Sequence, residues 1–378
     1  MTGCSSGSSH KPGQHGGSGG GGKTTHASLV ISPDGGSSVN PAVPVVVKAL
    51  HGTLKTVTVT NADGKPVQGA LSADKTAWTS SEALGYGKSY QIAASASGED
   101  GKTVDKTSSI QTVKPRATAY PSFIPAPSTT DVGIGQPIVV QFDQPVASAN
   151  RAAVERSLIV TSTPAQPGSW YWISNKQVDY RPQNYWQAGT DITLDAKVYG
   201  VDFGNGVYGQ TERTLKLHVH DAWVAKADGA AHSMQIFHNN QLVNTMPISL
   251  GSPDHQTHSG IHVISAKDPS VVMDSSTYGV GPGQPGYYRE TVYLDERISN
   301  DGEFLHAAPW SVGDQGNSNV SHGCINLSNA NAQWFYDHFG PGDVVEVANA
   351  GPDKLPVWDM YGDWSLNWTD WLAGSAQH

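Results

Sequence analysis

Helical patterning is nearly absent from this chain of 378 residues, and short β-type runs separated by turn sequences take its place. Residues 23–113 are dominated by Thr, Val and Ser, and the alternating run 56–60 leads into the turn sequence Asn-Ala-Asp-Gly. Strands that recur every ~8–12 residues without a helical pattern favour a small β-sandwich. We therefore predict a mainly β chain whose first sandwich spans residues 24–113, with Trp78 in its core.

The same pattern continues through residues 114–220. A strand is indicated at 138–143, the aromatic segments 170–173 and 178–182 flank a short turn, and the alternating run 215–220 closes the unit. Two aromatic runs around a turn predict a β-hairpin, and most of these rings are expected to pack in a core. The pattern favours a second sandwich of the immunoglobulin-like (Ig-like) class, the class we also assign to the first.

From residue 221 the pattern changes. Two strand-like runs flank a hairpin turn at 239–240, and residues 279–286 are rich in Gly and Pro, as in a loop or lid. The clearest helix of the chain runs from Ser328, a capping residue, to Phe339, and Gly-Pro-Gly ends it. Residues 221–350 therefore predict a β-rich domain with one clear helix.

The C-terminal segment 351–378 is rich in tryptophan. Four Trp lie within fourteen residues, at positions 358, 364, 368 and 371. Such a cluster seldom occurs in a disordered tail. We expect this Trp-rich subdomain to pack on the preceding domain, which we favour over an aromatic sugar-binding platform.

Charge and hydropathy argue against two classes of function. The chain has 23 Lys and Arg against 33 Asp and Glu, a net charge of −10. Phosphate contacts supply most nucleic-acid affinity, so an acidic chain is a poor nucleic-acid binder. No stretch approaches the ~20 apolar residues of a membrane span.

The N-terminal segment 1–23 is a flexible tether by composition, since its first 22 residues include nine Gly and five Ser. Within it, Met1-Thr2-Gly3-Cys4 resembles the end of a bacterial lipoprotein signal, in which the Cys becomes the lipidated N-terminus. The charged and apolar regions that precede such a Cys are not seen here. Cys4 is therefore a candidate lipidation site, with a chance match as the alternative.

The second cysteine, Cys324, is the candidate nucleophile. His322 lies two residues before it, and residues i and i+2 of a strand share a face, so both side chains could line one cleft. His306 is the other possible base. A neighbouring His raises the thiolate fraction, so we expect Cys324 to titrate below the free-thiol pKa of ~8.5. Gly323 allows backbone amides to approach an oxyanion, and Asn326 is expected to point into the same cleft.

Two other interpretations of this cysteine stay open from spacing alone. Cys324 could be a buried apolar residue beside a His by chance. His306, His322 and Cys324, with His255 or His258, could instead hold zinc, although the spacing differs from the usual paired ligands.

Residues 321–326, Ser-His-Gly-Cys-Ile-Asn, together with His306, resemble the signature of the YkuD-type L,D-transpeptidases. The fourteen residues between His306 and Ser321 match the spacing of that signature. The resemblance covers residues 115–375, and more loosely 24–114, and is to actinobacterial members with two N-terminal Ig-like domains. The segments that carry it outside the signature are 199–202, 274–279, 306–311, 331–338 and 362–364.

The resemblance implies that residues 221–350 are a catalytic domain that uses no metal and no cofactor. Cys324 would attack the carbonyl between diaminopimelate and D-Ala of a peptidoglycan tetrapeptide stem, release D-Ala, and pass the acyl group to an amine of a neighbouring stem, giving a 3→3 cross-link. His306 would be the general base, oriented by the Ala307 carbonyl, and His322 would shape the cleft. The implied oxyanion and substrate contacts are Tyr288, Asp301, Gly302, Ser321, Gly323, the Cys324 amide and Asn326.

The segment 292–302 departs most from the family pattern. It is acidic at Asp295, Glu296 and Asp301, and Asp301-Gly302 stands where the family usually has Ser-Gly.

Three functions remain to be compared: the transpeptidase, an L,D-carboxypeptidase that uses water as acceptor, and a non-catalytic wall-binding protein. For the first, the resemblance implies peptidoglycan stems as donor and acceptor, a role in wall organisation and cell shape, and acylation by carbapenems. We expect an extracytoplasmic monomer in the cell envelope, anchored to the outer face of the plasma membrane if Cys4 is lipidated.

Overall fold

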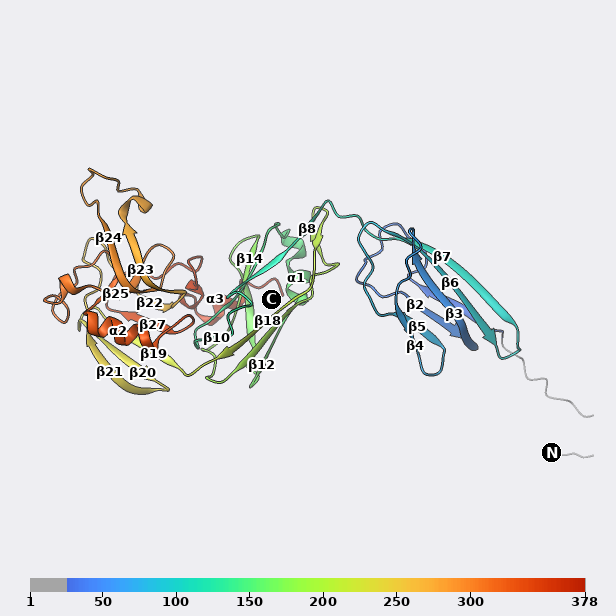
Figure 1. Ribbon diagram of the computed structural model, residues 1–378, viewed down its shortest axis with the longest axis horizontal. Helices are drawn as coiled ribbons and strands as arrows, with labels where there is room; N and C mark the ends of the chain where they lie inside the picture. Colours follow the sequence, from blue (N-terminus) through green and yellow to red (C-terminus); the bar gives the residue numbers. More distant parts are fainter. Residues whose placement is uncertain (1–25, 378) are drawn as a thin grey trace, which may run out of the picture. The chain divides into compact units, whose positions relative to one another are not determined.

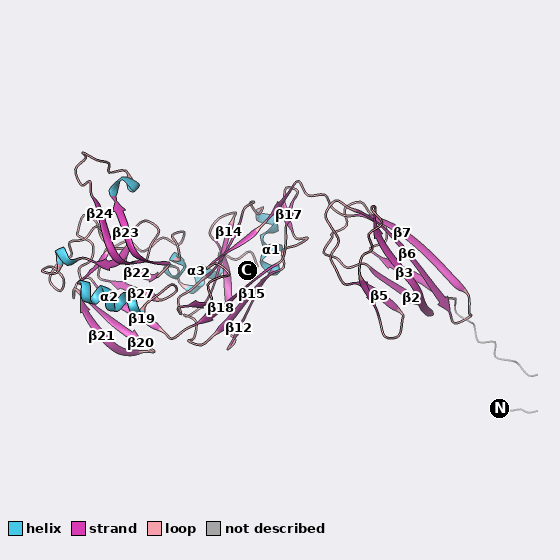
Figure 2. Cartoon of the chain, in the orientation of Figure 1, coloured by secondary structure: helices cyan, strands magenta, loops and turns pink. Residues whose placement is uncertain are grey.

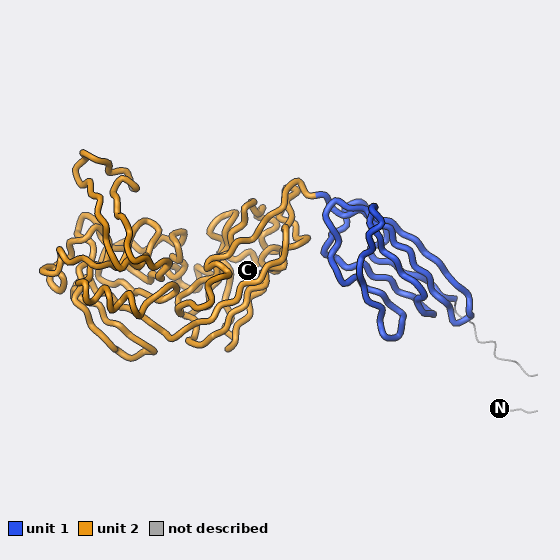
Figure 3. The backbone as a smooth tube through the Cα atoms, viewed as in Figure 1, with its two compact units in different colours: residues 1–114 blue, residues 115–378 orange. Residues whose placement is uncertain are grey.

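The computed structural model describes residues 26–377, and the chain forms two compact units with their sequence boundary between Lys114 and Pro115 (Figure 1, Figure 3). Both units are built mainly of strands, as the sequence predicts (Figure 2). Cys4 and the rest of the tether lie outside the described residues. Among the residues that are described, no helix has the length and apolar character needed to cross a membrane.

The first unit is a β-sandwich. Its two sheets have the strand orders β1-β2-β5-β4 and β3-β6-β7. Burial alternates along β6, and side chains from both sheets, including Ile92 and the predicted anchor Trp78, fill one core. The strands are β1 (Ser28–Ser32), β2 (Val46–Leu50), β3 (Gly52–Asn61), β4 (Gly69–Leu71), β5 (Ala77–Ser80), β6 (Ser89–Gly98) and β7 (Thr103–Gln111).

The second unit begins with another sandwich, whose sheets have the orders β13-β14-β11-β9 and β10-β18-β15-β12, beside the small sheet β16-β17-β8. The predicted aromatic hairpin is β13 and β14, which pair with Trp170 opposite Tyr180. The elements are β8 (Ala117–Ala119), β9 (Pro121–Ile124), β10 (Asp131–Val132), β11 (Ile138–Phe142), α1 (Arg151–Ser157), β12 (Leu158–Thr163), β13 (Gly168–Trp172), β14 (Gln177–Pro182), β15 (Asp191–Ala196), β16 (Asp202–Gly204), β17 (Val207–Gly209) and β18 (Arg213–Val219).

Two further sheets, β21-β20-β19-β27-β22 and β23-β24-β25-β26, follow in the same unit and share one apolar core with helix α2. The predicted helix is confirmed, because Ser328 Oγ accepts a hydrogen bond from the Asn331 amide at 3.2 Å. The elements are β19 (Trp223–Asp228), β20 (Ser233–His238), β21 (Gln241–Pro247), β22 (Gly260–Val263), β23 (Ala266–Asp274), β24 (Arg289–Arg297), β25 (Phe304–Ala307), β26 (Ile325–Leu327), α2 (Asn329–His338) and β27 (Val344–Ala348).

The Trp-rich tail packs both on the second sandwich and, around Tyr361 and Trp364, on β22 of the sheets that directly precede it. The Arg181 guanidinium of β14 lies 4.5 Å from the ring centroids of both Trp364 and Trp371. Trp371 Nε1 also donates to the Ser169 carbonyl at 2.9 Å. Trp358 is the exception and is 67% exposed. Helix α3 (Trp368–Leu372) lies here; the 3-10 helices of the chain are η1 (Ser148–Asn150), η2 (Ser275–Tyr278), η3 (Pro309–Ser311) and η4 (Gly362–Ser365).

Candidate active site

Two neighbouring parallel strands bring the signature residues together. Strand β25 carries His306, β26 follows Cys324 directly, and the register pairs His306 with Asn326. Since Cys324 lies two residues before Asn326, both come to the side of the sheet that His306 faces. Residues that are distant in the sequence thus meet through one strand pairing.

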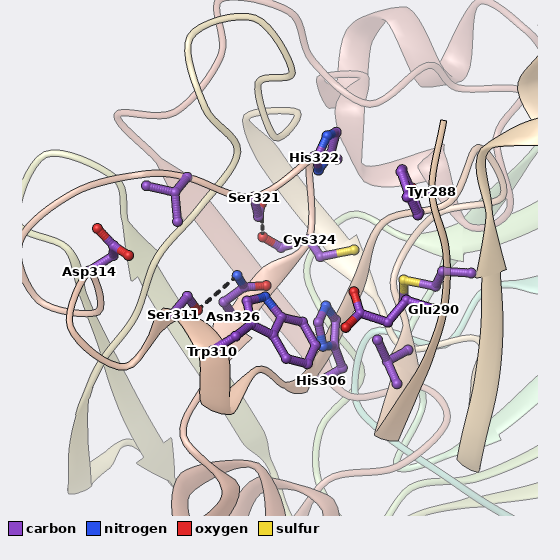
Figure 4. A pocket seen from close by; sticks show the side chains of 13 residues that line it. Tyr288, Glu290, His306, Trp310, Ser311, Asp314, Ser321, His322, Cys324 and Asn326 are labelled. Carbon is purple, nitrogen blue, oxygen red and sulfur yellow. Dashed lines mark hydrogen bonds between the residues drawn. The ribbon is translucent and has the colours of Figure 1, made fainter. Parts of the chain in front are cut away.

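These side chains open on one pocket of about 320 Å³. Figure 4 shows the Cys324 sulfur and the His306 ring inside it, with Tyr288 and Glu290 on the opposite wall. We call this the thiol chamber. Its lining is Met273, Tyr288, Glu290, Val292, His306, Trp310, Ser311, Asp314, Val320, Ser321, His322, Cys324 and Asn326.

The turn before β26 is held by side chains that hydrogen-bond its backbone. Ser321 Oγ donates to the Cys324 carbonyl at 2.6 Å and accepts from the Gly323 amide at 3.1 Å. Thr257 Oγ1 donates to the Gly323 carbonyl at 2.7 Å and accepts from the Gly251 amide at 2.9 Å. Thr257 was not predicted, because nothing in its local sequence marks it. We expected the Gly323 amide to contact an oxyanion, but this amide already donates its hydrogen bond to Ser321 Oγ.

The prediction that His322 and Cys324 share a face as residues i and i+2 of one strand is wrong. Gly323 has φ +118°, a conformation that L side chains rarely adopt, and β26 begins only at Ile325. The extended alternation that would align His322 with Cys324 is therefore broken. His322 still lines the thiol chamber, but its ring packs against Tyr288, with the ring centroids 5.0 Å apart, and against His255, at 4.8 Å. Burial, and next the nearby His255, lower the pKa of His322.

His306 is buried, and its ring is oriented by a backbone group. Its Nδ1 lies 3.0 Å from the Ala307 carbonyl, which can only accept, so this nitrogen carries the proton and Nε2 is left with a lone pair. Burial lowers the pKa of His306, and the bond to Ala307 opposes that effect only in part. The predicted orienting carbonyl is confirmed, and His306 is a neutral acceptor near neutral pH.

The electrostatics of Cys324 differ from our expectation. Its side chain is buried, and burial raises the pKa of the thiol to about 12. The Phe304 backbone amide acts to lower that pKa, while the charges of Glu303 and Asp295 raise it further. In this structure desolvation outweighs the stabilisation of the thiolate, which is opposite in direction to the pKa that we expected from the sequence.

Asn326 holds a loop as well as lining the pocket. Its Nδ2 donates to Ser311 Oγ at 3.1 Å (Figure 4). Gln315 Nε2 donates to the Ala308 carbonyl at 3.1 Å. Both bonds fix the segment after β25, which also supplies Trp310 to the thiol chamber. Ser311 belongs to the segment 306–311 that carries the family resemblance, so the sequence contained a signal for it.

A second chamber, of about 400 Å³, lies on the other side of His322, Tyr288 and Met273, which line both spaces. Asp301 and Gly302 line this acidic chamber together with His258 and Glu303. The Gly302 carbonyl also lies 3.8 Å from Cys324 Sγ. Of the predicted contacts, Tyr288 lines both chambers, whereas Asp301 and Gly302 line the acidic chamber alone.

The zinc arrangement around the thiol is not supported. Within residues 26–377, the one metal-compatible group of His, Cys, Asp and Glu side chains is His258, Asp301 and Glu303, which excludes Cys324, His306 and His322. Cys324 itself is a free cysteine.

Comparison with known proteins agrees with this geometry. Residues 36–202 match the model of a bacterial Ig domain, and residues 223–347 match that of the L,D-transpeptidase catalytic domain. L,D-transpeptidase 2 of Mycobacterium tuberculosis (strain CDC 1551 / Oshkosh) is 39% identical over 344 residues, which are 91% of this chain and 83% of the relative. L,D-transpeptidase 5 of M. tuberculosis (strain ATCC 25618 / H37Rv) is 37% identical over 350 residues, 91% of this chain and 75% of that relative.

A solved structure of an L,D-transpeptidase, LdtMt1 in complex with imipenem, superposes with a TM-score of 0.53 at 35% identity and covers 60% of this chain and 97% of that one. With the domain match, the extended similarity and the shared signature in agreement, this chain belongs to the L,D-transpeptidase family, the enzymes that cross-link peptidoglycan.

Proposed function

We propose that this enzyme forms 3→3 cross-links by cysteine acyl transfer from a tetrapeptide stem, with Cys324 as nucleophile and His306 as general base. The observation that carries the proposal is the bond between His306 Nδ1 and the Ala307 carbonyl, 3.0 Å long. It leaves Nε2 as the proton acceptor in the chamber that also contains the thiol. His322, by contrast, packs between Tyr288 and His255 and shapes the wall of that chamber.

The first half-reaction transfers the donor to the enzyme. Cys324 Sγ attacks the carbonyl carbon between diaminopimelate and D-Ala while His306 Nε2 takes the thiol proton. The C–N bond then breaks, D-Ala leaves with the proton returned by His306, and a thioester remains on Cys324.

The second half-reaction forms the cross-link. The side-chain amine of a second stem's diaminopimelate attacks the thioester carbonyl, and His306 accepts a proton from that nitrogen. The C–S bond breaks, the sulfur recovers the proton, and the free thiol is regenerated. Water in place of the amine gives the L,D-carboxypeptidase reaction on the same residues.

The raised pKa of Cys324 and the lowered pKa of His306 bear on the timing of the first proton transfer. Both shifts favour the neutral thiol and the neutral imidazole at pH 7. The thiol therefore loses its proton as the carbon–sulfur bond forms, rather than from a preformed ion pair.

The related enzyme solved with imipenem supports a second reactivity. We propose that the Cys324 thiol opens the β-lactam ring of carbapenems and becomes acylated once per chain. Because stem peptides are the substrate, we also propose that the chain acts outside the plasma membrane. Lipidation of Cys4 would anchor it to the outer face through the Gly/Ser-rich segment.

The test is incubation of the purified protein with a disaccharide-tetrapeptide, followed by mass spectrometry. The proposal predicts a cross-linked dimer that has lost one D-Ala, and no product from Cys324→Ala. Tripeptide alone would identify a carboxypeptidase. Unchanged substrate would instead favour a non-catalytic wall-binding protein.

A further inference from the structure

The acidic chamber contains a group of ligand-type side chains that the acyl transfer does not use. His258, just before β22, meets Asp301 and Glu303, which lie between β24 and β25. His258 Nδ1 is 3.0 Å from Glu303 Oε1 and 3.7 Å from Asp301 Oδ2. One ligand atom from each of the three residues lies within 4.8 Å of the other two.

An ordinary ion pair accounts for only part of this group. Glu303 Oε1 accepts from both the amide and the ring of His258. Glu303 is only 5% exposed, however, and its Oε2 is buried and accepts no hydrogen bond from any described residue. His262 Nδ1 lies 3.8 Å from Oε2 and faces the Ile298 carbonyl at 3.2 Å, while His262 Nε2 faces the His258 carbonyl at 2.9 Å.

A third carboxyl group adds to the local negative charge. Asp359 is 4% exposed, and its Oδ1 accepts from the Asn300 amide at 2.6 Å. Its Oδ2 is buried and, within residues 26–377, likewise accepts no hydrogen bond. Its charge acts on His258, while burial and the charge of Asp301 raise the pKa of Asp359 itself. Buried carboxylate oxygens without partners are costly, and a cation bound beside Glu303 would offset part of that cost.

We propose that His258, Asp301 and Glu303 bind one divalent transition-metal ion, of the Zn²⁺ class, in the acidic chamber. One imidazole nitrogen with carboxylate oxygens is a ligand set suited to zinc, whose bonds to N and O are ~2.0–2.2 Å long. Ligand atoms on a tetrahedral zinc lie roughly 3.4 Å apart at those bond lengths. The 3.7 Å between His258 Nδ1 and Asp301 Oδ2 is close to that value. The 3.0 Å between His258 Nδ1 and Glu303 Oε1 is a hydrogen bond, whose proton the metal ion would displace on binding.

The site lies directly behind the turn that carries Cys324. A Cβ placed on Gly323 would contact Glu303 Cγ at 3.6 Å, so the metal ligand and the turn are in van der Waals range. The charge of Glu303 also acts on the thiol. A bound cation would therefore offset a charge that disfavours the thiolate. The inference rests on this cluster alone and does not depend on the proposed function.

The experiment is isothermal titration calorimetry of ZnCl₂ into the full chain in a Cys4→Ser, Cys324→Ser background, which removes both thiols as competing ligands. We expect one equivalent of Zn²⁺ to bind at this cluster in the background, in addition to any taken up by the N-terminal histidines. Asp301→Asn and Glu303→Gln should each weaken that binding at least tenfold. His218→Gln, at an exposed His–Asp pair in the second sandwich, should leave it unchanged.

Every variant keeps the histidines of the N-terminal segment, so binding by them cancels in the comparison. If Glu303→Gln fails to fold, Asp301→Asn decides, because the Asp301 side chain is 41% exposed and its loss should not unfold the protein. Equal binding by the background and by Asp301→Asn would overturn the proposal. So would a Zn²⁺ site that disappears in His322→Gln and persists in Asp301→Asn.

Discussion

The two chambers that meet at the turn carrying Cys324 differ in what their walls provide. The thiol chamber presents His306, an imidazole kept neutral by burial, with the aromatic ring of Trp310 beside it. The acidic chamber presents Asp301 and Glu303 around His258. One side thus supplies a proton acceptor for the thiol, while the other supplies charge that opposes thiolate formation. The comparison indicates that the group that accepts the thiol proton lines one chamber, whereas charge that raises the thiol pKa lines the other.

The largest expected effect comes from removing the sulfur on which both chambers act. Cys324→Ala should abolish cross-linking while leaving the melting temperature nearly unchanged, because the side chain is small and is a free cysteine. Activity and thermal unfolding are measured on the same preparation. A variant that keeps most of its activity would rule out the nucleophile, and one that unfolds would indicate a structural thiol.

The next effect separates the two histidines. His306→Ala should lower the rate of cross-linking by ~10²–10⁴, the usual contribution of a general base. His322→Ala should lower it less, since His322 belongs to the wall shared by both chambers. Steady-state rates of the two variants are compared at saturating donor. A larger loss in His322→Ala would reverse the assigned roles.

A smaller effect is expected from removing the Thr257 hydrogen bonds that hold the turn before β26. Thr257→Val keeps the side-chain shape but removes the hydrogen bonds to the Gly323 carbonyl and from the Gly251 amide. We expect a loss of ~1–3 kcal/mol in the free energy of unfolding, as for a buried group left unpaired. Turnover should fall about tenfold, because displaced reacting groups lose their alignment.

The matched control for this substitution is Thr214→Val, which removes an exposed bond to Asp195 in the second sandwich. Denaturant unfolding and turnover are measured for both variants. Equal effects would show that Thr257 does not position the turn.

The smallest effect is expected from Asp295, which lines neither chamber but whose charge changes the pKa of the Cys324 thiol. Asp295 is buried, and burial raises its pKa to about 7, so it is largely charged only above that pH. Its charge raises the pKa of Cys324. Asp295→Asn should therefore speed alkylation of Cys324 by iodoacetamide a few-fold at pH 8.5 and leave the rate at pH 5.5 unchanged.

The same substitution has a predictable sign for stability. A carboxyl group whose pKa is raised by folding stabilises the protein fully below its unfolded pKa of ~3.9, and this contribution is lost as pH rises through about 7. Asp295→Asn should thus raise the melting temperature more at pH 8 than at pH 5. A uniform shift at both pH values would argue against ionisation of Asp295 in the folded protein.

Local patterns in the sequence predicted local structure well. The aromatic hairpin of β13 and β14, the turn at Asn239-Asn240 and the cap at Ser328 each depend on residues within a few positions of one another. The signature also identified His306 and its orienting carbonyl, because both lie in one short segment.

The environment of the thiol could not be predicted in the same way. Its pKa depends on burial and on the charges of Glu303 and Asp295. Asp295 lies where the register of β24 with β25 shifts, between Tyr293 and Glu296, and next to Leu294 with φ +58°. The strand alternation proposed for His322 failed because Gly323 takes a conformation that the sequence permits but does not dictate. Likewise, the contact of His258 with Glu303 spans 45 positions and depends on the folded sheets.

The most direct test of the central claim is intact-protein mass spectrometry after rapid mixing with a tetrapeptide donor and no acceptor. The account predicts a single adduct with the mass of the donor minus D-Ala, located on Cys324 and absent from Cys324→Ala. It should form much more slowly in His306→Ala. Cross-linked product formed by Cys324→Ala, or an acyl adduct located on any other residue, would contradict acyl transfer through this thiol.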